Sequence, residues 1–94
     1  LMKSETTIVN NPAGLHARSA ATIVKLATRF RCDITFENVD KTASANNIMA
    51  LLMLEATEGS KLKISAEGPD EAEALTAMIN LIRVNFGEFG EFRE

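Results

Sequence analysis

The chain has 94 residues, of which 46 % are hydrophobic, and carries a formal net charge of −3 with a pI near 5.2. This length fits one domain with an ordinary core, and the acidic balance argues against nucleic acid or an anionic membrane surface as a partner. One cysteine excludes an internal disulfide, and no signal peptide or apolar run of about 20 residues is present, so we expect a cytoplasmic protein without direct membrane insertion.

The first half of the sequence predicts a strand, a helix and two further strands. Residues 5–10 have the pattern of a short strand, and the breaker cluster of residues 10–14 then predicts a loop. Residues 32–37 alternate apolar with polar side chains and predict a half-buried strand, and residues 42–45 predict a short return strand after a turn. Between the loop and these strands, apolar residues at helical spacing predict an amphipathic helix with the buried stripe Ala20, Ile23, Val24, Ala27 and Phe30.

The second half predicts a short helix, a strand and a longer helix. Asn47 precedes an apolar run and suits an N-cap, because its side chain can accept a hydrogen bond from the first turn, so we expect a helix over residues 47–54. Residues 62–67 alternate again and predict a strand. Pro69 is expected at the first position of the last helix. The buried stripe of that helix is expected to be Ala72, Leu75, Met78, Ile79 and Ile82.

Strands that alternate in this way have one polar face, so helices are expected to cover the other face in a two-layer α+β sandwich. The element order is βαββαβα, and without its last helix it would also suit a ferredoxin-like domain. We expect one domain over residues 2–85 and an acidic tail over residues 86–94. Phe89 and Phe92 join no helical stripe, and we expect this tail to be mobile or to dock onto another surface.

The candidate for chemistry is His16, the one histidine of the chain, at the junction of the loop and the first helix. A helix start offers N–H groups and a positive dipole end to an anion, and imidazole is a nucleophile that can hold a phosphoryl group. Arg18 is a fixed cation two residues further on, in a first third of the chain that is basic although the whole is acidic. A single histidine near a helix start is more often a cap or a surface residue, so these residues alone leave its role open.

Residues 11–18, Asn-Pro-Ala-Gly-Leu-His-Ala-Arg, resemble the active-centre segment of the HPr family, the phosphocarriers of the bacterial phosphoenolpyruvate-dependent phosphotransferase system (PTS). The family motif is Gly-[Leu/Ile/Met]-His-Ala-Arg-Pro-Ala, and six of its seven positions match. The resemblance extends to residues 47–52, which align with the family's second helix, and to residues 68–72, which align with the start of its last helix. It covers about residues 4–84 of the chain.

The resemblance implies an open-faced sandwich in which three helices cover one face of a four-stranded antiparallel sheet. It implies a phosphoryl carrier and not an enzyme, with His16 phosphorylated on Nδ1, Arg18 as the phosphate partner, and Ala17 and Ser19 as phosphate neighbours. The donor would be the first enzyme of the PTS. The acceptor would be an EIIA-type protein that serves sugar uptake or nitrogen-branch regulation, and residues 50–56 favour the nitrogen branch. We expect a monomer with no cofactor and no metal.

Two residues depart from the family pattern. Ser19 stands where the motif has proline, so it adds a main-chain N–H near the phosphate site and loosens the backbone. The alternative for Ser19 is a neutral exchange, which we favour. Asn47 occupies the position at which many Gram-positive members carry a regulatory serine, so kinase control at that position is expected to be absent.

Candidate partner-binding residues come from the first two helices. Lys25 and Arg29 are either part of a solvated helix face or charges that steer acidic partners toward the chain, and the basic first third favours steering. The short helix has more apolar residues than one buried face can hold, so we expect Leu51 and Leu54 in the core. By resemblance, three of its residues sit beside the active centre and touch partners: Ile48, Met49 and Leu52. Cys32 alternates with core residues, so we expect it in the core and not as a redox thiol.

Two other kinds of function fit parts of the sequence. A ferredoxin-like regulatory domain would bind a small molecule and would need no reactive histidine. A regulator derived from a carrier would dock a partner protein without useful phosphotransfer, which the departure at Ser19 makes conceivable. A phosphoryl adduct on His16 separates the carrier from the binding domain, and partner binding that survives loss of His16 would indicate the regulator.

Overall fold

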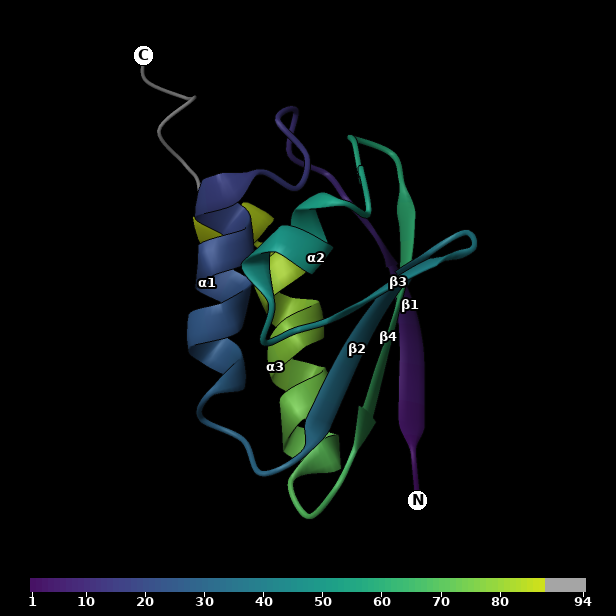
Figure 1. Cartoon of the computed structure of the whole chain (residues 1–94), viewed down its shortest axis with the longest axis vertical. Coiled ribbons are helices and arrows are strands. Elements are labelled where there is room, and N and C mark those ends of the chain that lie inside the picture. The colour runs from purple at the N-terminus through teal and green to yellow at the C-terminus, as the bar shows by residue number, and fades with distance from the viewer. Residues whose placement is uncertain (88–94) are drawn as a thin grey trace.

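The computed structural model describes residues 1–87, which form a four-stranded antiparallel sheet with three α-helices on one face (Figure 1). The elements in chain order are β1 (Lys3–Ile8), α1 (Ala17–Ala27), β2 (Asp33–Asn38), β3 (Lys41–Ser44), α2 (Ile48–Leu52), β4 (Lys61–Glu67), α3 (Glu71–Arg83) and the 3-10 helix η1 (Asn85–Gly87). The strand order in the sheet is β1-β4-β2-β3. The predicted α+β class and element order are confirmed. No helix within these residues is long and apolar enough to cross a membrane.

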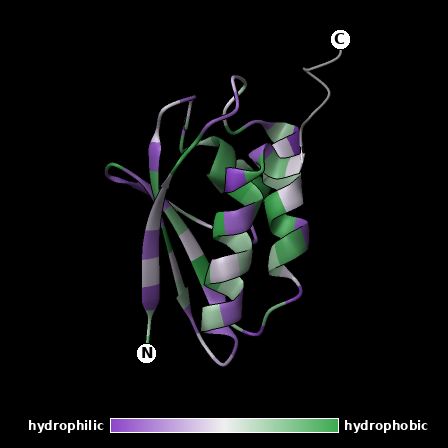
Figure 2. Ribbon diagram, turned by 180° about the vertical axis from the view of Figure 1, so that it is seen from behind, coloured by the Kyte–Doolittle hydropathy of each residue, from purple (hydrophilic) through white to green (hydrophobic). Residues whose placement is uncertain are grey.

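The sheet separates a polar face from a buried face. On the central strand β4, Lys63 lies opposite Thr6 of β1 and opposite Glu37 of β2, and its neighbours Leu62 and Ile64 point the other way and are fully buried. The edge strand β1 is mostly hydrophilic along its length (Figure 2). The prediction from the period-2 alternation is therefore confirmed: one face of the sheet is in water and the other packs against the helices.

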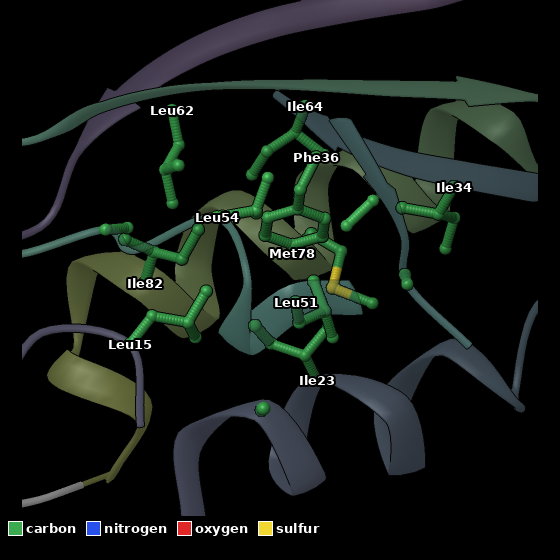
Figure 3. Close-up of a cluster of buried hydrophobic side chains, with 14 of the residues drawn as sticks. Leu15, Ile23, Ile34, Phe36, Leu51, Leu54, Leu62, Ile64, Met78 and Ile82 are labelled. Atoms are coloured by element: carbon green, nitrogen blue, oxygen red, sulfur yellow. The ribbon is translucent and has the colours of Figure 1, made fainter. Parts of the chain in front are cut away.

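The core lies between the sheet and the three helices (Figure 3). The largest fully buried side chains come from both layers and include Phe36, Ile64, Ile23, Leu51 and Met78. Each such side chain contributes about 1.5–3 kcal/mol when it leaves water. Because these residues belong to five different elements, the core holds α1 and α2 firmly in place on the sheet.

The start of α3 differs from the prediction. Pro69 is not the first helical residue, because the helix begins at Glu71 with Asp70 as its N-cap residue, and Pro69 lies in the preceding turn. Asp70 does not cap its own helix with its side chain; its Oδ2 accepts a hydrogen bond of 2.8 Å from the N–H of Arg31. The turn with Pro69 thus brings Asp70 against the segment before β2, a non-local contact that the local sequence does not show.

Two buried positions near the end of the described chain were not expected. Ala74 is buried in the stripe of α3, whereas the expected Ala72 is exposed. Phe86, which the prediction assigned to the tail, is 6 % exposed and belongs to the core. Positive φ angles of 57° at Asn85 and 59° at Phe86 turn the chain back onto the core there. The predictions for residues 88–94 lie outside the described residues.

Candidate functional site

The loop before α1 is folded by its own polar groups. Asn11 is 2 % exposed, and its Nδ2 donates to the carbonyl of Gly14 at 2.9 Å, while the N–H of Gly14 donates to the carbonyl of Asn11 at 3.0 Å. The N–H of Leu15 donates to the carbonyl of Ala56 at 2.9 Å, and the Leu15 side chain is buried in the core cluster (Figure 3). The loop is therefore attached to the segment after α2 and to the core immediately before it reaches His16.

His16 is the N-cap residue of α1. Its backbone is extended, with φ −128° and ψ −177°, and Nδ1 of its half-buried imidazole accepts a hydrogen bond of 3.3 Å from the N–H of Arg18. Because Nδ1 accepts this bond, the neutral ring carries its proton on Nε2. The Nδ1 lone pair thus faces the N–H groups and the positive dipole end at the start of α1.

Ser19, the third residue of α1, is fully buried and bonds to both peptide groups of His16. Its Oγ accepts from the N–H of His16 at 2.8 Å and donates to the carbonyl of His16 at 3.0 Å. The His16 side chain also accepts from the backbone of Ser19, which completes a capping box. Glutamate or glutamine usually holds this third position in a capping box. The family resemblance predicts Ser19 as a neighbour of a phosphoryl group on His16, but it does not predict that the Ser19 hydroxyl holds the main chain of His16.

The remaining candidates lie on α1 or directly after it, and all of them are exposed. Ala17 is the first helical residue and Arg18 the second, and both are exposed next to His16. Lys25 and Arg29 are also exposed: Lys25, seven residues after Arg18, lies on the same side of α1 as Arg18, whereas Arg29 lies in the turn just after the helix ends at Ala27. Lys25 lies about 10 Å along the axis from Arg18. We call Arg18, Lys25 and Arg29 the basic row.

The short helix α2 lies beside the N-terminal half of α1 (Figure 1). The predicted N-cap is confirmed, since Oδ1 of Asn47 accepts from the N–H of Ala50 at 3.0 Å. Ile48 is 39 % exposed and Met49 is 67 % exposed, whereas Leu52 is half-buried and packs against the core. Two leucines that were expected in the core are buried there: Leu51 and Leu54.

Cys32 packs against the core just before β2 and is half-buried. Burial raises the pKa of its thiol, and the carboxylates of Asp70, Asp33 and Glu71 raise that pKa further. A thiol that stays protonated is a poor nucleophile and a poor metal ligand. In the part of the chain that the structure describes, no three side chains of the metal-binding types come together.

Known proteins resemble this chain in sequence and in fold. The family model described as "PTS HPr component phosphorylation site" matches residues 3–83. Phosphocarrier protein NPr of Klebsiella oxytoca is 38 % identical over 85 residues, which cover 89 % of this chain and 94 % of that protein. Phosphocarrier protein HPr of Pseudomonas aeruginosa is 41 % identical over 85 residues, with coverage of 89 % and 93 %. The crystal structure of HPr-C-His from Thermoanaerobacter tengcongensis matches with a TM-score of 0.86 and 42 % identity, covering 92 % of this chain and 97 % of that chain.

Proposed function

Because this chain belongs to the PTS HPr family and is a phosphocarrier protein, we propose that Nδ1 of His16 is the atom that takes up the phosphoryl group. The hydrogen bond from the N–H of Arg18 to Nδ1 carries this proposal. This bond supports the proposal, because it holds Nδ1 at a helix start, where N–H donors and the helix dipole stabilise an anionic group.

The transfer needs a lone pair on the nucleophile and a site for the charge that arrives. Nδ1 attacks the phosphorus of the phosphorylated donor, the bond between phosphorus and the donor breaks with its electron pair staying on the donor, and Nε2 keeps its proton. The phosphoryl oxygens then accept from the first turn of α1 in place of the imidazole. Transfer to the acceptor reverses these steps and returns His16 to its starting state, so the chain carries the group without a net reaction of its own.

The surfaces around His16 support the proposed partners. The donor is the first enzyme of the PTS, the acceptor is an EIIA-type protein, and the basic row fits acidic surfaces on both. Ile48 and Met49 form an exposed apolar patch on the neighbouring helix α2, which suits protein contact. One copy of the chain contains every group of this site, which supports action as a monomer. The proposed location is the cytoplasm, where these partners would meet the chain.

The direct test is incubation with phosphoenolpyruvate and the first enzyme, followed by intact mass measurement and peptide mapping. We expect one phosphoryl group on His16, labile in acid and stable in alkali. Offering the phosphorylated chain to a sugar-branch and a nitrogen-branch acceptor in parallel identifies the branch by the faster transfer. A chain that stays unmodified, as a ferredoxin-like binding domain would, or that is modified at another residue, overturns the proposal.

Arg18→Ala is expected to slow phosphoryl uptake about 10- to 100-fold, because in this proposal the Arg18 guanidinium stabilises charge on the phosphoryl oxygens in the transition state. Its side chain is exposed, so the free energy of unfolding should change by less than about 0.5 kcal/mol. Rapid-quench transfer rates from the first enzyme measure the effect. Arg31→Ala removes another exposed arginine, beyond the opposite end of α1, and should leave the rate unchanged. Equal rates in both variants would show that Arg18 is only a surface charge.

Met49→Glu is expected to weaken binding to the first enzyme about tenfold or more, because a charge would replace an apolar contact beside the active centre. Met49 is 67 % exposed, so stability should hardly change. Isothermal titration with the first enzyme gives the affinity. Val39→Glu is the matched control, since Val39 is 85 % exposed in the β2–β3 turn, on the other side of the molecule from α1 (Figure 1). An equal loss in both variants would reflect added negative charge in general and not a contact at Met49.

A further inference from the structure

The environment of Ser19 is unusual for a residue that would be a neutral exchange. Its side chain has no exposed surface, and its hydroxyl makes two hydrogen bonds, both to the main chain of His16. One of these bonds fixes the peptide group before the His16 side chain and the other fixes the peptide group after it. The hydroxyl therefore holds the stretch of backbone from which the imidazole extends.

The backbone of Ser19 makes a second contribution to the site. The capping box includes a contact from the Ser19 main chain to the His16 side chain, on the side where Nδ1 also accepts from Arg18 at 3.3 Å. The family motif has proline at this position, and proline has no N–H to donate. The start of α1 in this chain thus has one main-chain donor near Nδ1 that the motif residue cannot supply.

We propose that Ser19 is a positioning residue for phosphotransfer: its hydroxyl holds His16 so that Nδ1 stays the unprotonated atom, and its N–H binds a phosphoryl oxygen after the transfer. This inference rests on the phosphorylation of Nδ1 proposed above. Hydrogen bonds to a charged acceptor are stronger than those to a neutral one, so the Ser19 N–H stabilises the phosphorylated state more than the free state. The chain consequently retains its phosphoryl group more firmly than a version with proline.

Two variants separate the two contributions. Ser19→Ala removes the hydroxyl and keeps the N–H, whereas Ser19→Pro removes both. Thr22→Ala is the matched control, because the Thr22 hydroxyl donates to the carbonyl of Arg18 in the same helix and lies about 9 Å along the helix axis from His16. All three variants are made in the full chain. The ¹⁵N spectrum of the imidazole and the fraction phosphorylated at equilibrium with the first enzyme are then measured.

In the unmodified chain we expect one tautomer, with Nδ1 unprotonated, and in Ser19→Ala a mixture of both tautomers. In Ser19→Pro the equilibrium constant for phosphorylation should fall about three- to tenfold, while Thr22→Ala matches the unmodified chain in both measurements. An unchanged tautomer in Ser19→Ala, or an unchanged equilibrium in Ser19→Pro, overturns the positioning role although His16 is still phosphorylated. If Ser19→Pro does not fold, the spectrum of Ser19→Ala decides by itself. An unmodified chain without phosphoryl on His16 overturns the proposed function instead.

Discussion

His16→Ala is expected to abolish phosphoryl uptake completely while the fold remains in place. His16 is the one histidine of the chain, so no second imidazole can take over the role of nucleophile. The variant also loses the N-cap contact to the N–H of Arg18, and replacement of a capping side chain by alanine costs about 0.5–2 kcal/mol. Domains of this size have a total stability of about 5–15 kcal/mol, so the variant should stay folded.

His16→Asn is the matched variant, because asparagine is among the best N-cap residues but is no phosphoryl acceptor. We expect it to unfold at the same or a higher urea concentration than the unmodified chain and to gain no mass with phosphoenolpyruvate and the first enzyme. A phosphoryl adduct on either variant would contradict the assignment of His16. If the unmodified chain also binds its partner but transfers no phosphoryl group, the result would instead favour a regulator that only docks.

The sequence predicts those parts of the fold whose causes are local. Alternation over residues 32–37 and 62–67 identifies the two central strands, because a strand with one wet face must alternate. Asn47 marks the start of α2 because a capping side chain bonds within its own turn. The position of His16 at a helix start also follows from the breaker loop before it and the apolar stripe after it.

The features that the sequence does not predict depend on contacts between distant segments. The sequence does not identify Asp70 as the partner of the Arg31 N–H, which is 39 residues away, and it therefore predicts Pro69 as the first helical residue. Phe86 belongs to no helical stripe in the sequence, because a reversal with positive φ after α3, and not a continuation of α3, returns it to the core. The role of Ser19 is missed for a different reason. Both of its hydroxyl bonds are local, but they form a capping box with serine at the position where glutamate or glutamine is usual.

Gly14→Ala is expected to cause the largest loss of stability among the substitutions considered for this site. Gly14 has φ +67°, where a residue with a Cβ costs about 1–2 kcal/mol more than glycine. The added Cβ would lie 2.6 Å from the carbonyl oxygen of Ala56 and 2.9 Å from Cα of Thr57, both backbone atoms that no rotamer change can move. Overpacking of this kind costs about 1–3 kcal/mol in addition.

Gly59→Ala separates the clash of Gly14→Ala from its backbone strain. Gly59 also has positive φ, +92°, but an added Cβ there meets no atom within 4 Å, so only the strain of about 1–2 kcal/mol should appear. In urea unfolding we therefore expect Gly14→Ala to lose about 2–5 kcal/mol in total. The same oxygen of Ala56 accepts from the N–H of Leu15, so the clash displaces the loop immediately before His16. Phosphoryl uptake should therefore slow in Gly14→Ala but not in Gly59→Ala. Equal losses of stability in the two variants would mean that the contact with residues 56–57 does not hold the loop.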